Sequence, residues 1–282
     1  MNLARHPAVQ RLVETALEED IGRGDVTTRA ILAPDVRAIA TIEAEAPGVI
    51  AGTFLAPLVY HALDPELAIE CLAGEGAAVA ARQAVVRVVG RAAPILAGER
   101  VLLNLLQHLA GVATLTRRFV AAVAGTGVAI VDTRKTTPGF RLLEKHAVRV
   151  GGGVNHRFGL DDGILIKNTH VALTGGTAKA VERARANAPA GLRVQVECRS
   201  ASEVEAALAA GVDAVLLDNC TVAEAAALVR QIDRRLTVEL SGGVTLDNVA
   251  AYARTGADRI SIGALTHSAP ALPLHLRIEA VV

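Results

Sequence analysis

The sequence predicts an α/β protein with a mixed N-terminal part and a C-terminal part of parallel strands. In the C-terminal part, short apolar runs alternate with helical segments of about ten to fifteen residues, which is typical of parallel βα units. The N-terminal part instead combines helical patterns with strands of alternating polarity. The C-terminal part contains six βα units in succession. That number fits either an incomplete barrel or an open doubly wound sheet.

The N-terminal part contains two helical patterns and two candidate strands. Apolar residues at helical spacing within residues 9–17 predict the first helix. The segment Asp20–Thr28, rich in Gly, Asp and Thr, is expected to be a loop. Val36–Ala46 alternates apolar and polar residues, as a half-buried strand does, and Val85–Val89 is the second candidate strand. A long helix is expected over residues 98 to about 124, with the domain boundary inside it.

The six apolar runs of the C-terminal part are the candidate parallel strands. They are Val128–Val131, Ile164–Ile166, Val194–Val196, Ala214–Leu217, Thr237–Leu240 and Ile260–Ile262. Helical segments such as Ser202–Ala210 and Val222–Ile232 lie between them. The closing segment, Leu272–Val282, is expected to return to the first domain as a strand or a helix. We therefore expect a first domain of residues 1–110 with 271–282, and a second domain of residues 111–270.

Composition and charge exclude several classes of function. Apolar residues make up 51% of the 282 residues and aromatic residues only 2%, so a nucleic-acid surface built on base stacking is not expected. Lys+Arg and Asp+Glu are both 29, so an anion site requires a local cluster of basic residues. Neither a CxxC pair, a signal peptide nor an apolar run of about 18 residues is present. We expect a cytoplasmic protein with no membrane partner.

Polar or glycine residues follow every candidate strand. They are Asp132-Thr133-Arg134-Lys135, Lys167, Glu197, Asp218-Asn219, Ser241-Gly242-Gly243 and Gly263. In a βα barrel these strand ends converge on one mouth, where the active site is built. Polar residues are expected at the end of any strand, and chance alone would mix their types. Along this chain, however, the first strand ends carry cations, the middle ones carry carboxylates and the last ones carry glycines. That separation favours one convergent site.

The cations are concentrated at two successive strand ends and the loop before the second. They are Arg134, Lys135, His156, Arg157 and Lys167. Guanidinium groups bind carboxylates and phosphates in a bidentate manner, whereas Lys acts as a point charge. The cluster indicates a substrate with several negative charges, and a solvated basic face is the alternative. That alternative is favoured for Arg141, Lys145 and Arg149, which have helical spacing.

The carboxylates Glu197 and Asp218 end adjacent units and are expected to be neighbours. Hard oxygen ligands in small number suit Mg²⁺, which keeps water ligands and is shared with substrate phosphates. The same carboxylates could stabilise positive charge that develops on a sugar, or could pair structurally with nearby cations. No His-rich pattern indicates zinc.

The glycine turns favour a phosphate site. Ser241-Gly242-Gly243 lies between a strand and a helix start, where backbone N–H groups can hold phosphate. Gly263 follows the next strand, and the last two loops of a barrel are a frequent phosphate site. A phosphorylated sugar diphosphate with an anionic acceptor would satisfy the phosphate turns, the carboxylates and the cations together.

Longer motifs resemble one family over nearly the whole chain. They are EEDIGRGDVTT, GERVLLNLLQHLAG, DTRKTTPGFRLLEKHAVRVGGGVNHRFGLDDGILIKNTHV, VECRS, LLDN, SGGV and SIGALTHS. In this order they resemble the quinolinate phosphoribosyltransferases, also called nicotinate-nucleotide pyrophosphorylases. The resemblance implies an N-terminal α/β sandwich joined to an open, incomplete parallel α/β barrel.

The resemblance also implies an activity, a cofactor and an assembly. Quinolinate and phosphoribosyl diphosphate would give nicotinate mononucleotide, pyrophosphate and carbon dioxide, with Mg²⁺ required, as a step of NAD biosynthesis. The enzyme would be a homodimer or larger, with Arg100 offered to the neighbouring subunit's site.

Site residues are implied by motif match. Thr133, Arg134, His156, Arg157 and Lys167 would bind quinolinate, and Lys135 would reach substrate or diphosphate. Glu197 and Asp218 would lie at the ribose and the metal. The 5′-phosphate would be bound by Ser241, Gly242, Gly243, Gly263, Ala264 and His267.

Two positions depart from the family pattern. The strand-ending lysine is usually followed by an acid, Asn and His, whereas this chain has Asn168-Thr169-His170 after Lys167. Leu240 stands where a small residue is expected.

Three other functions remain as alternatives. The first is a related phosphoribosyltransferase acting on another base, like the molybdenum-associated paralogues, but Arg134, Lys135 and Lys167 together favour quinolinate. The second is a lyase with a Schiff base on Lys135 or Lys167. Such a lysine requires an apolar pocket, and these lysines lie among other cations. The third is a catalytically silent phosphate-binding protein.

Overall fold

The computed structural model describes residues 2–189 and 191–281, and the chain divides into two compact units. The first comprises the chain up to Arg117, Thr137–Gly152, and the chain from Ser268 onward. The second comprises Arg118–Thr136 and Gly153–His267. Helix α4 (Ala92–Ala122) belongs to both units, because the division falls within it. The boundary expected near residue 110 also falls within this helix.

A four-stranded antiparallel sheet forms the centre of the first unit. Its strands, in spatial order, are β12 (Leu274–Val281), β1 (Arg37–Ala44), β5 (Ala84–Arg91) and β3 (Ala68–Cys71). A separate pair is formed by β2 (Gly48–Val49) and β4 (Ala78–Val79). The alternation that predicted β1 produces a buried face, and its buried apolar residues are Ala38, Ala40, Ile42 and Ala44.

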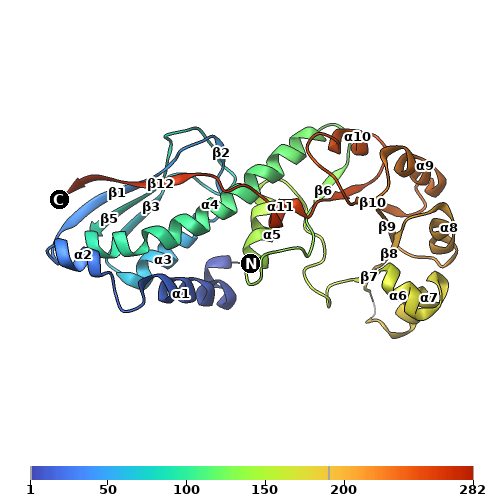
Figure 1. Ribbon diagram of the computed structural model, residues 1–282, viewed down its shortest axis with the longest axis horizontal. Coiled ribbons are helices and arrows are strands. Elements are labelled where there is room, and N and C mark those ends of the chain that lie inside the picture. Colours follow the sequence, from blue (N-terminus) through green and yellow to red (C-terminus); the bar gives the residue numbers. More distant parts are fainter. Residues whose placement is uncertain (1, 190, 282) are drawn as a thin grey trace. The chain divides into compact units, whose positions relative to one another are not determined.

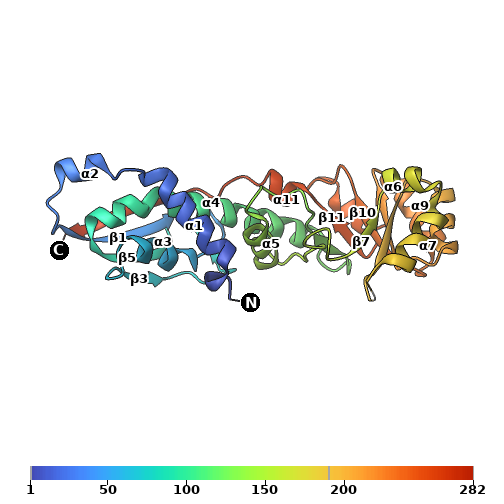
Figure 2. The same cartoon turned by 90° about the horizontal axis from the view of Figure 1, so that it is seen from below.

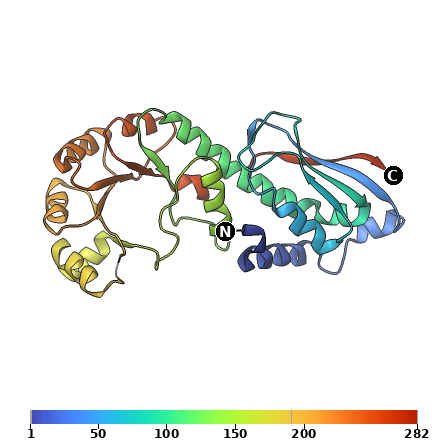
Figure 3. The same cartoon turned by 180° about the vertical axis from the view of Figure 1, so that it is seen from behind.

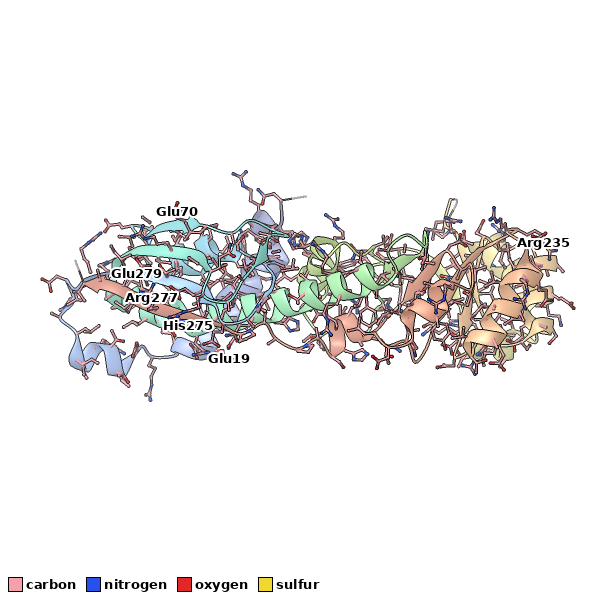
Figure 4. All side chains as sticks on the ribbon, turned by 90° about the horizontal axis from the view of Figure 1, so that it is seen from above. Glu19, Glu70, Arg235, His275, Arg277 and Glu279 are labelled. Carbon is pink, nitrogen blue, oxygen red and sulfur yellow. The ribbon has the colours of Figure 1, made fainter. Side chains whose placement is uncertain are left out.

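The C-terminal segment is a strand that pairs with β1. His275, Arg277 and Glu279 follow one another along β12 (Figure 4). Arg277 Nη2 lies 2.6 Å from Glu43 Oε1, and the Thr41 hydroxyl donates to Glu279 over 2.6 Å. Backbone pairing and these polar contacts together hold the end of the chain on the sheet.

The remaining elements of the first unit are helical. A 3-10 turn (Leu3–Arg5) is followed by α1 (Pro7–Ile21), α2 (Val26–Ile31), α3 (Leu55–Leu63) and later α5 (Arg141–Val150). Helix α1 packs on α3, and α3 packs on β3 (Figure 2). The prediction of a loop over Asp20–Thr28 is correct only for residues 22–25, because α1 continues through Ile21 and α2 begins at Val26. There Asp25 caps α2 by accepting the Thr28 N–H at 2.9 Å.

Helix α5 differs from its expected solvated basic face. Lys145 and Glu144 are buried. Glu144 accepts a hydrogen bond from the Thr137 backbone N–H at 3.1 Å and lies 2.8 Å from His108 Nε2. The helical spacing of these cations therefore did not establish exposure at every position, because Arg149 is exposed, as expected, whereas Lys145 is buried.

Six parallel strands form the sheet of the second unit. In spatial order they are β6 (Ala129–Val131), β11 (Arg259–Ser261), β10 (Thr237–Ser241), β9 (Ala214–Asp218), β8 (Val194–Cys198) and β7 (Ile164–Ile166). Strands β6 and β7 are the two edges, so within the described residues the barrel is open. The predicted α/β class with an incomplete parallel barrel is confirmed.

Helices cover the outer side of this curved sheet. The helices of this unit that follow the strands are α6 (Asn168–Thr174), α7 (Thr177–Asn187), α8 (Ala201–Ala209), α9 (Val222–Ile232), α10 (Val249–Ala253) and α11 (Ala264–His267). Helices α7, α8 and α9 lie outside the strands in Figure 1 and Figure 3. None of the helices in the described parts of the chain is both long and apolar enough to cross a membrane.

Strand alternation gives the inner side of the sheet a polar lining. On β8, Val194, Val196 and Cys198 are buried, while Gln195 and Glu197 point to the other face. Because successive side chains of a strand point to opposite faces, residues two apart along each strand share the inner side. That arrangement places pocket-lining side chains such as Glu197 on the inner side of the sheet.

Candidate active site

One pocket of about 240 Å³ lies at the carboxyl ends of the six strands. It is lined by Thr133, Arg134, Lys135, His156, Arg157, Leu165, Lys167, Glu197, Leu216, Asp218, Glu239, Ser241 and Ser261. All of these residues belong to the second unit. The structure therefore brings together the cations, both carboxylates and the first residue of the glycine turn that the sequence placed at strand ends.

Buried Asp132 joins two of the sequence motifs. Its two carboxylate oxygens accept hydrogen bonds from the Asn155 side-chain amide at 2.6 Å and from the His156 backbone N–H at 2.8 Å. An isolated parallel β-bridge between Val131 and Val154 joins the same two segments of the chain. The first strand end thereby fixes the loop that carries His156 and Arg157.

Glu239 is a buried pocket residue that the sequence reasoning missed. Its carboxylate lies 3.4 Å from His156 Nε2 and accepts a hydrogen bond from the Gln195 amide at 3.1 Å. Burial acts to raise the pKa of Glu239, but the hydrogen bonds from His156 and Gln195 leave that pKa below its ordinary value. The available signal was strand periodicity, since Glu239 precedes Ser241 by two residues on β10.

Both ring nitrogens of His156 have neighbours within the protein. Nδ1 accepts the backbone N–H of Arg157 at 2.8 Å, and Nε2 faces Glu239. This arrangement selects the tautomer with hydrogen on Nε2. The imidazole is therefore fixed in orientation at the wall of the pocket.

Two guanidinium groups lie near each other in the pocket. Arg157 Nη1 donates to the Gly163 carbonyl at 2.7 Å. Burial, and then the nearby charge of Arg134, hold the pKa of the Arg157 guanidinium below its ordinary value. With Lys135 and Lys167 on the same lining, the pocket is suited to a ligand with more than one negative charge.

Glu197 and Asp218 are neighbours, as expected, and they share one cation. Arg199 Nη2 lies 3.1 Å from Glu197 Oε1 and 3.2 Å from Asp218 Oδ2. Asn168 Nδ2 donates to Glu197 at 3.0 Å, and Asn219 Nδ2 donates to Asp218 at 2.8 Å. The sequence reasoning assigned no role to Arg199.

The departure at Asn168 is accommodated by this network. An acid at that position would repel Glu197, whereas the amide of Asn168 donates to it. The following turn is closed by the Lys167 backbone N–H, which donates to His170 Nδ1 at 2.9 Å.

The carboxylate pair has a donor set that fits Mg²⁺. Within the described residues no group of three or more His, Cys, Asp and Glu side chains forms a metal cage. The neighbouring carboxylates Glu197 and Asp218, in a pocket that is also lined by cations, match an ion that takes most of its ligands from water and substrate phosphates. Glu197 and Asp218 are the residues that would hold it.

The two glycine turns adjoin the pocket. Gly242 and Gly243 have positive φ values of 93° and 62°, which favours glycine. A Cβ on Gly242 would lie 2.9 Å from the Asn219 backbone nitrogen and would clash with the Asn219 side chain. The Asn219 N–H donates to the Ser241 carbonyl at 2.8 Å, so Asn219 connects the carboxylate strand to the glycine turn.

Gly263 is approached by two candidate phosphate ligands. A Cβ at this position would lie 3.0 Å from Lys135 Cδ and 3.1 Å from His267 Nε2. Ala264 begins the short helix α11, and the hydroxyl of Thr266 in that helix donates to the Lys135 carbonyl at 2.8 Å. The segments that follow β6 and β11 thus meet at this turn.

Arg100 is the one sequence-predicted site residue in the first unit. It is exposed on α4, whereas the others all belong to the second unit.

Comparison with known proteins finds one family over both parts of the chain. The N-terminal domain model of quinolinate phosphoribosyl transferase matches residues 25–110, and the C-terminal domain model matches residues 112–277. A nicotinate-nucleotide pyrophosphorylase (carboxylating) of Mycobacterium leprae is 41% identical over 278 residues, covering 95% of this chain and 96% of that protein. A quinolinate phosphoribosyltransferase (decarboxylating) of Nicotiana tabacum is 37% identical over 295 residues, covering 97% and 84%.

A solved structure has the same fold along its full length. The nicotinate-nucleotide pyrophosphorylase of Francisella tularensis superposes with a TM-score of 0.93 at 36% identity, covering 99% of both chains. Family models over both parts of the chain, identity over nearly its whole length and a shared fold lead to one conclusion. This chain belongs to the quinolinate phosphoribosyltransferase family.

Proposed function

We propose that this protein is a pentosyltransferase that moves the phosphoribosyl group of phosphoribosyl diphosphate to quinolinate. The products are nicotinate mononucleotide, pyrophosphate and carbon dioxide, in de novo NAD biosynthesis. The observation that carries the proposal is that cations, a carboxylate pair and the glycine-turn residue Ser241 line the same pocket.

The cations of the pocket bind the dicarboxylate base. Arg134 and Arg157 provide paired guanidinium donors, and Lys167 adds a point charge from the end of β7. Thr133 and His156 line the same wall. A base with two carboxylates on adjacent ring carbons matches this charge better than a base with one.

The glycine turns bind the 5′-phosphate of the sugar. Ser241, Gly242 and Gly243 present backbone N–H groups, and Gly263 with Ala264 forms the second turn. His267, whose ring approaches Gly263, adds a side-chain nitrogen to this turn. These contacts orient the anomeric carbon toward the bound base.

The carboxylates act at the sugar during transfer. The lone pair of the pyridine nitrogen forms a bond to the anomeric carbon while the bond to the diphosphate oxygen breaks, and the electrons leave with pyrophosphate. Positive charge develops on the sugar, and Glu197 and Asp218 stabilise it. Lys135 stabilises the departing negative charge.

Decarboxylation follows from the new charge on the ring. Once the nitrogen is quaternary, the ring accepts the electron pair released as the adjacent carboxylate leaves as carbon dioxide. A proton then takes its place on that carbon. The protein contributes by holding the reactants together and excluding water, which would hydrolyse the activated sugar.

We further propose that Mg²⁺ is required and is held by Glu197 and Asp218 together with the substrate diphosphate. When bound, it neutralises charge on the leaving group. The protein is expected to act in the cytoplasm as a homodimer or larger, with Arg100 reaching the neighbouring subunit's site. Light scattering of the purified protein tests the assembly, and a monomer would contradict it.

Product analysis tests the proposed reaction. The protein is incubated with quinolinate, phosphoribosyl diphosphate and Mg²⁺, and nicotinate mononucleotide is sought by mass spectrometry, with Lys135→Ala and Glu197→Ala as controls. We expect product from the wild type and much less from either variant. A folded protein that binds the sugar diphosphate but yields no product would exclude quinolinate and point to another base.

A further inference from the structure

The guanidinium group of Arg199 bridges the carboxylates of Glu197 and Asp218 through a single nitrogen atom. One atom, Nη2, lies 3.1 Å from Glu197 and 3.2 Å from Asp218. The Arg199 side chain is 56% exposed, against 13% and 18% for the two carboxylates. Its backbone N–H is fixed by Glu203 Oε2 at 2.6 Å. The base of the side chain is therefore held by the backbone contact, while more than half of the side chain is exposed to solvent.

Arg199 is the charge partner of this pair within the described residues. The ion pairs of Glu197 and Asp218 there are with Arg199, and the other donors, Asn168 and Asn219, are neutral amides. Two neighbouring carboxylates repel each other unless a cation lies between them. Removing the guanidinium would leave the amides in place and take away the cation that lies within ion-pair distance of both carboxylates.

We propose that Arg199 is a resident cation that occupies the place of Mg²⁺ until the metal arrives with the diphosphate. A guanidinium and a divalent cation compete for the same two negative charges, so free metal binds weakly while Arg199 bridges them. The inference rests on the proposed function for the identity of the diphosphate.

The diphosphate resolves this competition by providing Arg199 with a new partner. Glu197 and Asp218 would then hold the metal, and the released guanidinium would pair with phosphate oxygens, which its fork geometry matches. Lys135 and Lys167, on the same pocket lining, add to the attraction for the diphosphate. Arg199 is thus a positioning residue that couples metal entry to substrate entry.

Titration with Mn²⁺, followed by electron paramagnetic resonance, tests the coupling without turnover. We compare the wild type with Arg199→Ala and Arg199→Gln, first without substrate and then with phosphoribosyl diphosphate. Without substrate, both variants should bind Mn²⁺ about tenfold more tightly than the wild type. With phosphoribosyl diphosphate, the wild type should gain Mn²⁺ affinity and the difference should disappear or reverse.

Arg185→Ala is the matched control. Arg185 Nη2 lies 3.2 Å from Asp213 and its side chain is 45% exposed, but Asp213 precedes β9 whereas Asp218 ends it. This variant should bind Mn²⁺ as the wild type does. Circular dichroism confirms that each variant folds, and Arg199→Gln retains a hydrogen-bonding side chain if Arg199→Ala does not fold.

The outcomes separate this inference from the proposed reaction. Equal Mn²⁺ affinity of the wild type and both Arg199 variants without substrate would overturn the role of Arg199, whatever the product assay shows. Tighter Mn²⁺ binding by the variants supports it even if no nicotinate mononucleotide is formed. A several-fold rise in KM for phosphoribosyl diphosphate, with KM for quinolinate unchanged, is expected in the same variants.

Discussion

Individual side chains of the pocket are held by partners on other strands. Asp132 on the first strand end fixes the loop of His156, and Glu239 on β10 fixes the ring of the same histidine. Asn219 connects Asp218 to the glycine turn. Because a catalytic geometry must be held within a fraction of an ångström, these supporting residues matter as much as those that face the substrate.

Glu239→Gln should change the acid dependence of stability. The pKa of Glu239 in the folded protein lies below its ordinary 4.5. Its ionised form therefore contributes stability that is present above pH 4.5 and is lost as the pH falls through the folded-state pKa. We expect the variant to lose about 1–3 kcal/mol of unfolding free energy near pH 7, and the loss to shrink below pH 4.5.

Urea unfolding at several pH values measures this difference. Glu182→Gln, at an exposed position on α7, is the control and should show little effect at any pH. If the loss of unfolding free energy for Glu239→Gln stayed constant from pH 7 to the lowest pH at which the protein folds, it would contradict the lowered pKa of Glu239.

Glu197→Gln should lower kcat more than it changes binding. The substitution retains the shape of the side chain but removes charge that stabilises the sugar cation. We expect a fall in kcat of about 10²-fold to 10³-fold, the range for loss of one electrostatic contact to a transition state. Steady-state kinetics with both substrates measure it, and Glu182→Gln is again the control. A kcat within a factor of two of the wild type would exclude the proposed role.

At the scale of elements, the glycine turn after β10 depends on close packing as well as on backbone conformation. Gly242 and Gly243 both have positive φ, but only Gly242 packs against Asn219. At Gly243, a Cβ would meet no atom within 4 Å. The two neighbouring positions therefore separate the effect of contact from that of backbone strain.

Gly242→Ala should be more damaging than Gly243→Ala. Both variants strain the backbone, at about 1 kcal/mol each, but Gly242→Ala also pushes Asn219 away from Asp218 and Ser241. We expect a larger rise in KM for phosphoribosyl diphosphate and a lower melting temperature for Gly242→Ala. Equal effects of the two substitutions would show that Asn219 does not couple the turn to the carboxylates.

Sequence periodicity located the elements that carry the site, but not all of their contacts. The parallel strands follow from apolar runs, and Ile164–Ile166 and Val222–Ile232 coincide with β7 and α9. Helix α2 was missed because its capping residue, Asp25, lies in a segment rich in turn formers. Arg199 and Glu239 were missed because their roles depend on which strands are neighbours, and spacing along one strand does not give that.

At the scale of the whole molecule, the end of the chain returns to complete the first unit. Strand β12 pairs with β1 over most of its length, and Leu274 at its start is buried. The far end is different, since Val281 is 73% exposed. The structural contribution of the C-terminal segment is therefore concentrated at its beginning.

Leu274→Ala should destabilise the protein, whereas Val281→Ala should not. Removing a buried leucine side chain costs about 2–5 kcal/mol, while an exposed substitution changes stability by about 0.5 kcal/mol or less. Denaturant unfolding of the two variants against the wild type measures the difference. Similar stabilities for both would show that β12 contributes little to the first unit.

The fate of the carboxylate next to the ring nitrogen tests the central claim most directly. Quinolinate labelled with ¹³C in that carboxylate is incubated with phosphoribosyl diphosphate, Mg²⁺ and the protein, and the products are quantified by mass spectrometry. The account predicts unlabelled nicotinate mononucleotide and ¹³CO₂ in equal amounts, and no mononucleotide when nicotinate replaces quinolinate. Product that retains the label, or equal turnover of nicotinate, would contradict it.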